Sequence, residues 1–364
     1  MPPWTLFKYL LLRAALTMTA IFVALSALIF VADFMENLRF AEKYVDGSFG
    51  FAVRLTALRT PGLSQLLTPF IFLFGGFWMF SQLNRKSELS VMRSAGLSIW
   101  RLIGPPVMFA ACAGIFVVTA LDPLASQMTG LSEVLMDQKT GKQNSLVRVF
   151  GDGLWLRQHQ GEETLIINAD SLDDESATLR NVTVWRLDSE AVFLERVDAP
   201  SAELQNRQLR LEQAVLKARS QILPTKSPIY LLPTTISIDD LRAGTPAPES
   251  MPIWDLPRFA DIAEAAGLPR VRYDMRYHDL LSTPVKLMAM VMIAAMFSLR
   301  PARSGGTFQL TIAGVIVGFA LYFVTEFAGA LGESGSAPAS LAAWIPATLG
   351  ALFATTGLLI IEEG

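Results

Sequence analysis

The sequence is poor in the residues that enzymes and metal sites use. Its 364 residues include one cysteine, Cys112, and two histidines, His159 and His278. A single cysteine excludes an intrachain disulfide and a cysteine metal site. No P-loop, H-E-x-x-H, G-x-S-x-G or paired-carboxylate motif occurs, which argues against P-loop nucleotide binding and hydrolysis. We therefore expect no catalytic residue, no cofactor and no metal site, in a chain that is not an enzyme by itself.

Charge is also scarce, and the two signs nearly balance. Charged residues make up 17% of the chain and hydrophobic residues 52%, with a net charge of −3. In a typical soluble protein, about a quarter of the residues are charged. The balance gives no indication of a nucleic-acid partner. This composition predicts an integral membrane protein.

Apolar runs long enough to cross a bilayer fall into two groups of three. A spanning helix needs about 20 apolar residues, and the runs that meet this length are residues 10–33, 63–83, 99–121, 279–299, 307–331 and 340–361. The first run is too long for a signal peptide and lacks a small-residue cleavage site, so we expect it to be retained. The prediction is an α-helical membrane protein with about six spans, three on each side of an insert.

Basic residues in the short connections predict the orientation. By the positive-inside rule they belong to the cytoplasm, which places both termini there; they are Lys8, Arg13, Arg85, Lys86, Arg93, Arg101, Arg300 and Arg303. A second basic set then lies outside, close to the membrane, and conflicts with the rule; it comprises Arg39, Lys43, Arg54, Arg59, Arg270, Arg272 and Arg276.

The insert has the pattern of an all-β domain. Strands are predicted in six segments, 154–156, 164–167, 182–187, 191–194, 201–204 and 208–216. Short alternating strands about every 8–12 residues are typical of a β-sandwich or jelly roll. Residues 255–267 are predicted to form a helix that leads back to the membrane. The expected domains are 1–121 with spans one to three, 122–275 with the β domain, and 276–364 with spans four to six.

The connection after the second span is predicted to contain a short helix at about residues 85–97. Ser87 fits the N-cap, Glu88 the positive end of the helix dipole and Gly96 the C-terminal stop. Leu89, Met92 and Ala95 recur at helical spacing and form a small apolar face. Such a helix either lies flat on the membrane or inserts into a partner, and the residues alone leave both open.

This connection resembles the LptF/LptG family of lipopolysaccharide export permeases. The similar stretch is Arg85-Lys86-Ser87-Glu88-Leu89-Ser90-Val91-Met92-Arg93-Ser94-Ala95-Gly96. Residues 153–157 and 341–346 are also similar to the family, and the order of three spans, a β domain and three spans extends the resemblance over the whole chain. Residues 318–323 and 341–346 are more similar to the LptG branch than to the LptF branch.

The resemblance implies a permease subunit of an ABC transporter in the bacterial inner membrane, with the β jelly roll in the periplasm. It would extract lipopolysaccharide from the outer leaflet and pass it to a periplasmic bridge, driven by ATP hydrolysis in a separate subunit. The implied partners are lipopolysaccharide, an LptF-like second permease, a dimeric LptB-like cytoplasmic ATPase and a membrane-anchored LptC-like periplasmic protein. The alternatives are the LptF paralogue and a non-transporting scaffold that displays the β domain.

The resemblance also implies roles for individual residues. The residues implied to couple this chain to the ATPase are Arg85, Ser87, Glu88, Leu89, Met92, Arg93 and Gly96. Among them, Glu88 would pair with a basic residue of the ATPase. The residues implied to line an acyl-chain cavity between spans one and five are Leu25, Phe30, Phe34, Phe319, Tyr322, Phe323 and Phe327. The residues implied to contact the lipid phosphates are Arg39, Lys43, Arg272 and Arg276. The alternatives for these side chains are ordinary packing, lipid exposure and snorkelling at the interface.

Two ionisable residues lie inside the predicted spans. Lys286 is in the fourth span and Glu326 in the fifth, both at about 8–11 Å from the outer end. Unpaired charges at such depth are costly and mark functional sites. We expect the two side chains to pair; the alternative is that each snorkels separately.

Overall fold

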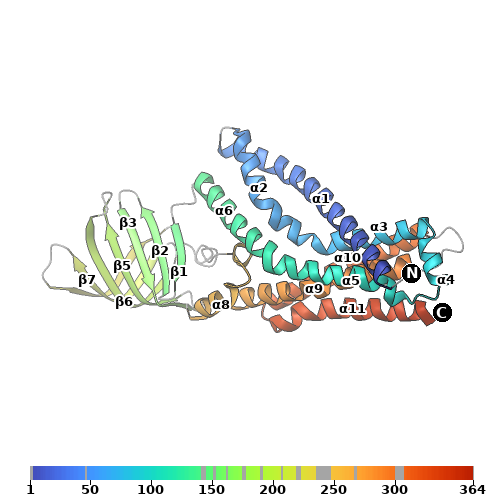
Figure 1. The fold of residues 1–364 in the computed structure, drawn as a ribbon. Coiled ribbons are helices and arrows are strands. Elements are labelled where there is room, and N and C mark those ends of the chain that lie inside the picture. The colour runs from blue at the N-terminus through green and yellow to red at the C-terminus, as the bar shows by residue number, and fades with distance from the viewer. Residues whose placement is uncertain are drawn as a thin grey trace. The chain divides into compact units, whose positions relative to one another are not determined.

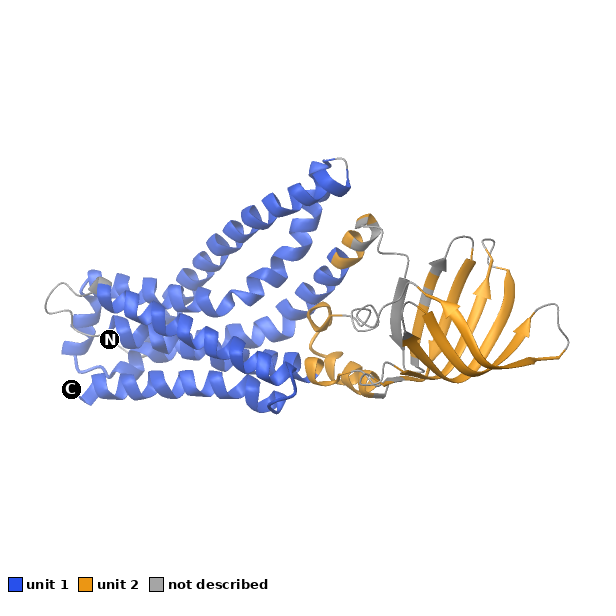
Figure 2. Cartoon of the chain, turned by 180° about the vertical axis from the view of Figure 1, so that it is seen from behind, with its two compact units in different colours: residues 1–132, 274–364 blue, residues 133–273 orange. Residues whose placement is uncertain are grey.

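The computed structural model divides the chain into two compact units, one of residues 1–132 and 274–364 and one of residues 133–273 (Figure 2). The structure describes residues 3–45, 47–140, 145–150, 153–160, 163–173, 178–188, 192–205, 208–218, 223–234, 247–265, 269–299 and 307–363. The basic residues Arg300 and Arg303 lie outside these ranges.

The first unit is a bundle of long helices (Figure 1). They are α1 Pro3–Tyr44, α2 Phe49–Leu66, α3 Thr68–Arg85, the short α4 Glu88–Ser94, α5 Ile99–Phe116, the π-helical η1 Val117–Leu121, α6 Asp122–Thr140, α9 Val271–Ser298, α10 Thr307–Glu333 and α11 Ala339–Glu363. Within the described residues, five stretches have the length and hydropathy of a membrane span, and α2 with α3, bent by 63°, makes up to six. The prediction of about six spans is confirmed.

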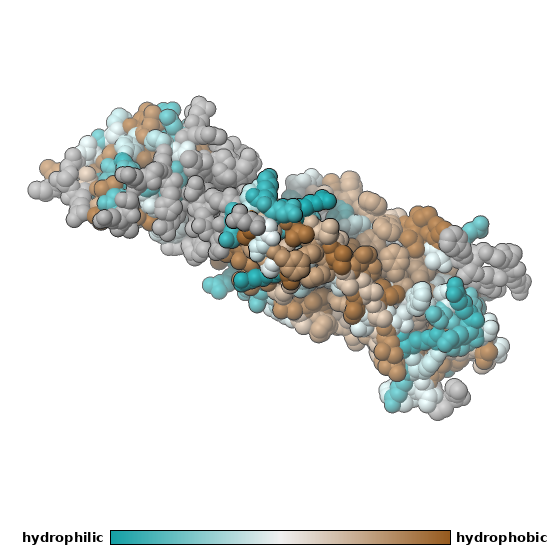
Figure 3. Space-filling model, turned by 90° about the horizontal axis from the view of Figure 1, so that it is seen from above, coloured by the Kyte–Doolittle hydropathy of each residue, from teal (hydrophilic) through white to brown (hydrophobic). Residues whose placement is uncertain are grey.

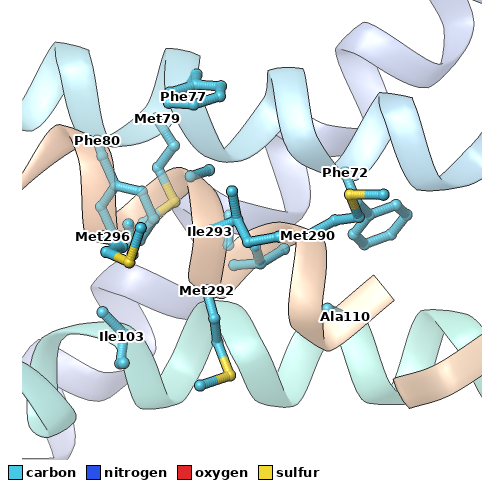
Figure 4. Close-up of a cluster of buried hydrophobic side chains, with 14 of the residues drawn as sticks. Phe72, Phe77, Met79, Phe80, Ile103, Ala110, Met290, Met292, Ile293 and Met296 are labelled. Carbon is cyan, nitrogen blue, oxygen red and sulfur yellow. The ribbon is translucent and has the colours of Figure 1, made fainter. Parts of the chain in front are cut away.

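Helix α9 lies at the centre of the bundle. In its most apolar window 61% of the residues are buried, against 11% in α1 and 11% in α10. Residues of α3, α5 and α9 fill the interior shown in Figure 4, including Phe72, Phe80, Ile103, Met290 and Met296. Since lipid is as apolar as these side chains, close packing rather than the hydrophobic effect holds such helices together. On the face shown in Figure 3, apolar residues cover the middle of this unit, and hydrophilic residues lie at both ends.

Helices α5 and α9 pack closely at Gly114. A Cβ at this position would lie 2.5 Å from the Cα of Pro284. We expect Gly114→Ala to force the two helices apart and to destabilise the protein by about 1–3 kcal/mol, measured as a lower melting temperature in detergent. Gly104→Ala is the matched control, because Gly104 lies on the same helix and a Cβ added there would meet nothing within 4 Å. Equal stability of the two variants would contradict this packing.

Helices α1 and α2 form a hairpin that a polar network joins. The Asn37 amide donates to Asp33 at 2.6 Å and to Thr56 at 2.9 Å, and Arg59 pairs with Asp33 at 3.2 Å. Asp33, Asn37 and Thr56 are buried. The first helix therefore continues beyond the predicted end at residue 33, and the chain returns as α2, which hydropathy alone did not predict.

In its described residues, the second unit is built on one antiparallel sheet of eight strands. The strands are β1 Ser145–Phe150, β2 Gly153–Gln160, β3 Glu163–Ala169, β4 Ser171–Asp173, β5 Thr178–Leu187, β6 Phe193–Gln205, β7 Gln208–Ala218 and β8 Thr225–Pro233. Their order is β1-β2-β3-β5-β6-β7-β8, with β4 paired to β5. A 3-10 turn, η3 Pro248–Ser250, and a helix, α8 Leu256–Ala265, complete the described part.

The sheet curls around one apolar face. Leu165, Ile167 and Val184 alternate with more exposed residues and are at most 2% exposed. Thr234, which follows β8, donates to Gln158 of β2 at 2.7 Å, and both residues are buried. This bond joins strands that are far apart in the sheet order. An inserted antiparallel β unit is confirmed, whereas the closed jelly-roll topology stays a prediction.

Candidate functional site

Helix α4 connects α3 to α5 and is shorter than predicted. Ser87 occupies the N-cap position, as predicted, with a left-handed φ of 56°, and its side chain makes no capping hydrogen bond. Gly96 ends the turn with φ +78°, a conformation that glycine adopts without strain, and Leu97 donates back to the carbonyl of Met92 at 3.3 Å. The glycine stop is therefore confirmed.

The apolar side of α4 faces the interior of its own chain. Leu89 is 5% exposed and belongs to the bundle core, with Met92 packed against it. The assignment of Leu89 to the groove of a partner is corrected, because this side chain already anchors α4. The apolar side chain that α4 leaves exposed is Val91, at 65%.

Glu88 joins α4 to α1. Its Oε2 accepts a hydrogen bond from the Tyr9 hydroxyl at 2.7 Å and forms an ion pair with Arg13 at 2.8 Å. Partial burial acts to raise the pKa of Glu88, but the hydrogen bonds from Tyr9 and Arg13 outweigh burial and hold that pKa below its ordinary value. The carboxylate is therefore ionised at neutral pH.

The bundle end that carries α4 is basic and holds both described chain ends (Figure 1). Arg85 and Lys86 are exposed beside α4, and Arg93 ends it half-buried. Glu362, near the C-terminus, accepts a hydrogen bond from the backbone N–H of Ile99 at 3.2 Å. The same end therefore presents α4 and several cations together.

The least buried spans, α1 and α10, carry the aromatic residues assigned to the acyl-chain cavity. Phe319, Phe323 and Phe327 follow at four-residue spacing along α10 and are 42%, 67% and 69% exposed. Four residues is about one helical turn, so these rings form one outward stripe. The rings of Phe319 and Tyr322 also contact α3, at 4.7 Å and 4.9 Å from the ring of Phe70.

The α1 residues of the predicted cavity are less exposed than those of α10. Leu25 packs against the bundle core, Phe30 is half-buried, and the ring of Phe34 lies 5.3 Å from that of Phe49 on α2. Leu28 and Val31, which lie between them, and Met35, which follows Phe34, are exposed. These three are functional candidates that the sequence argument missed, because it favoured aromatic residues.

Some of the basic residues predicted outside have acidic partners. Arg276 donates to the fully buried Asp122 at 3.1 Å, and Gln65 donates to the same oxygen at 3.0 Å. Arg270 pairs with Asp261 and Glu264. With Arg59 on Asp33, these pairs account for part of the conflict with the positive-inside rule.

Three of the four predicted phosphate contacts remain exposed. Arg39 and Lys43 project from the end of α1, and Arg272 from the first turn of α9. Within the described ranges, no ion pair involves Arg39. Arg276, in contrast, forms an ion pair with Asp122.

The expected pair of Lys286 with Glu326 is wrong. Lys286 forms an ion pair and hydrogen bonds with Asp279, which lies two turns earlier on the same helix. Glu326 is exposed and interacts with the hydroxyl of Tyr322 on its own helix. Each charge therefore finds a partner on its own helix. In the part of the chain that the structure describes, no group of three or more His, Cys, Asp or Glu residues is placed to hold a metal ion.

Long apolar helices around a buried central span, with a separate β unit inserted between them, define a multi-pass membrane protein. The sequence model of the lipopolysaccharide export system permease LptF/LptG family matches residues 8–360. The chain belongs to this family of inner-membrane permeases, which confirms the resemblance of its loop. It is also similar to the lipopolysaccharide export system permease protein LptG of Haemophilus influenzae, with 23% identity over 333 residues, 90% of this chain and 89% of that protein.

Proposed function

We propose that this chain is the LptG-type permease of an ATP-driven exporter that extracts lipopolysaccharide from the outer leaflet of the inner membrane. It works with an LptF-like second permease, an LptB-like ATPase dimer beneath α4 and an LptC-like periplasmic protein. Both termini then lie in the cytoplasm, and the β unit lies in the periplasm. The basic character of the end that carries α4 supports this orientation.

The observation that carries the proposal is the exposure of α1 and α10. One belongs to the first half of the chain and the other to the second, and each buries only 11% of its most apolar window. The exposed faces of α1 and α10 are suited to contact a second permease. Acyl chains of the lipid would then lie between this chain and that permease. Arg39, Lys43 and Arg272 are exposed cations suited to bind the phosphates of the lipid through charge-assisted hydrogen bonds.

Photocrosslinking tests the proposed lipid path. A photoreactive phenylalanine is placed at Phe323 of α10, and the matched control is Phe353 of α11, which is 50% exposed and also apolar. We expect lipopolysaccharide to crosslink at position 323 but not at 353, and the signal at 323 to fall when ATP is added to the complex. Equal crosslinking at both positions would indicate general lipid contact and contradict the path. Absence of any ATPase from the purified complex would favour the scaffold.

A further inference from the structure

Among the described residues, Glu88 uses one of its two carboxylate oxygens. Both Tyr9 and Arg13 bind Oε2, and Oε1 accepts no hydrogen bond from the described residues. A carboxylate has about four acceptor positions on its two oxygens. Glu88 therefore has room for a cation from a partner while it stays bound to α1.

The two α1 residues form one unit with Glu88. Tyr9 and Arg13 are one helical turn apart, and the Arg13 guanidinium also donates to the Tyr9 hydroxyl. The side chains of Arg13 and Glu88 are 16% and 29% exposed, so water screens this ion pair less than a pair on an open surface. This contact links α1 to a helix that is 75 residues away in the sequence.

Helix α1 is suited to carry a displacement along its length. Its 42 residues contain no glycine, and its one proline is Pro3, at the first position. At about 1.5 Å per residue the helix is roughly 60 Å long, and the causes of sharp helix kinks, proline and glycine, are absent from its interior. Its other end is fixed to α2 by Asp33, Asn37 and Arg59.

We propose that Tyr9 and Arg13 are positioning residues that transmit movement of α4 directly to the first span. Glu88 then acts as a bridge, with Oε1 toward a cation of the ATPase and Oε2 toward α1. The nucleotide-driven movement of the ATPase thereby reaches the exposed face of α1 through two hydrogen bonds as well as through core packing. This inference rests on the proposed function, since it assumes that an ATPase docks at α4.

The test uses the complete complex with the ATPase and the second permease in proteoliposomes. Arg13→Gln removes the charge but keeps a polar side chain, and Arg13→Lys restores the charge. Lys8→Gln is the matched control, because Lys8 is a cation of α1 that contacts the ring of Trp4 instead of Glu88. Three quantities are measured for each variant: ATPase retained on purification, ATP hydrolysed, and lipopolysaccharide released per ATP.

We expect Arg13→Gln to retain the ATPase and its hydrolysis rate while releasing about fivefold less lipopolysaccharide per ATP, the lower range of allosteric coupling. Arg13→Lys should recover most of this ratio, and Lys8→Gln should match the unaltered complex. An unchanged ratio in Arg13→Gln would overturn the inference. A proportional loss of bound ATPase, hydrolysis and release would also overturn it, since Arg13 would then only hold α4 in place. If the unaltered complex shows no ATP-dependent release, the proposed function itself fails.

Discussion

Alanine at position 88 is expected to abolish most lipopolysaccharide export while leaving the permease folded and inserted. The ionised carboxylate of Glu88 lies on α4 beside Arg85 and Lys86, at the end where the ATPase is proposed to dock. Removing one member of a desolvated, hydrogen-bonded charge pair costs about 2–5 kcal/mol of binding free energy. The lower figure alone corresponds to a roughly thirtyfold weaker ATPase complex.

The measurement compares Glu88→Ala with Glu363→Ala. Glu363 is an exposed carboxylate at the same end of the bundle, so its loss changes the net charge equally without touching α4. Both variants should reach normal membrane levels. We expect only Glu88→Ala to lose the ATPase on purification and to stop export in cells that depend on this copy. Normal export by Glu88→Ala would remove α4 from the coupling route.

The second large effect is expected on stability, at Asp122. This side chain is fully buried at the start of α6, where it accepts hydrogen bonds from Gln65 of α2 and Arg276 of α9. Asp122→Ala leaves the Arg276 guanidinium without its counter-charge in a partly buried site. Breaking such a pair by removing one partner destabilises a protein by about 3 kcal/mol or more. We expect a large drop in the melting temperature in detergent.

A double variant separates the charge from the packing. Replacing Arg276 by methionine together with Asp122→Ala removes both charges, so part of the lost stability should return. Glu42→Ala, an exposed acid of α1, should leave the melting temperature unchanged. Two results would contradict a stabilising ion pair between these helices. One is an Asp122→Ala melting temperature equal to that of Glu42→Ala. The other is a drop in melting temperature for the double variant that equals the sum of the drops for the two single variants.

Hydropathy predicted the spans well because the bilayer itself sets their length and polarity. It could not predict the outer part of α1 or the helix α2, since both lie where polar residues such as Asn37 and Arg59 are tolerated. Those residues look like a loop in the sequence, but their side chains pair across a hairpin. The bend of 63° after Leu66, between α2 and α3, leaves no hydropathy signal either.

Alternation of apolar and polar residues follows from a half-buried sheet, and it located β2, β3, β5 and β7. It divided β6 into two segments and missed β1, β4 and β8. The curl of the sheet was not predictable, since the bond from Thr234 to Gln158 joins segments 76 residues apart. The hydropathy pattern within one strand does not indicate which distant segment of the chain that strand contacts.

Pairing of side chains was the least predictable feature of the site. Depth in the membrane placed Lys286 and Glu326 at a similar level, but depth does not specify the side of the helix on which each lies. Lys286 instead meets Asp279, at a helical spacing that could have been noticed in the sequence. The contact of Arg13 with Glu88 had no such local signal, although a basic residue and a tyrosine at one-turn spacing marked the start of α1.

Every role proposed for this permease depends on movement of lipopolysaccharide when a partner hydrolyses ATP. The direct measurement is release of labelled lipopolysaccharide from proteoliposomes that contain this chain, the second permease and the ATPase, with a soluble periplasmic acceptor outside. We predict release that requires ATP and this chain and that disappears with Glu88→Ala. Release that continues without ATP, or that is unchanged when this chain is omitted, would contradict the proposed function.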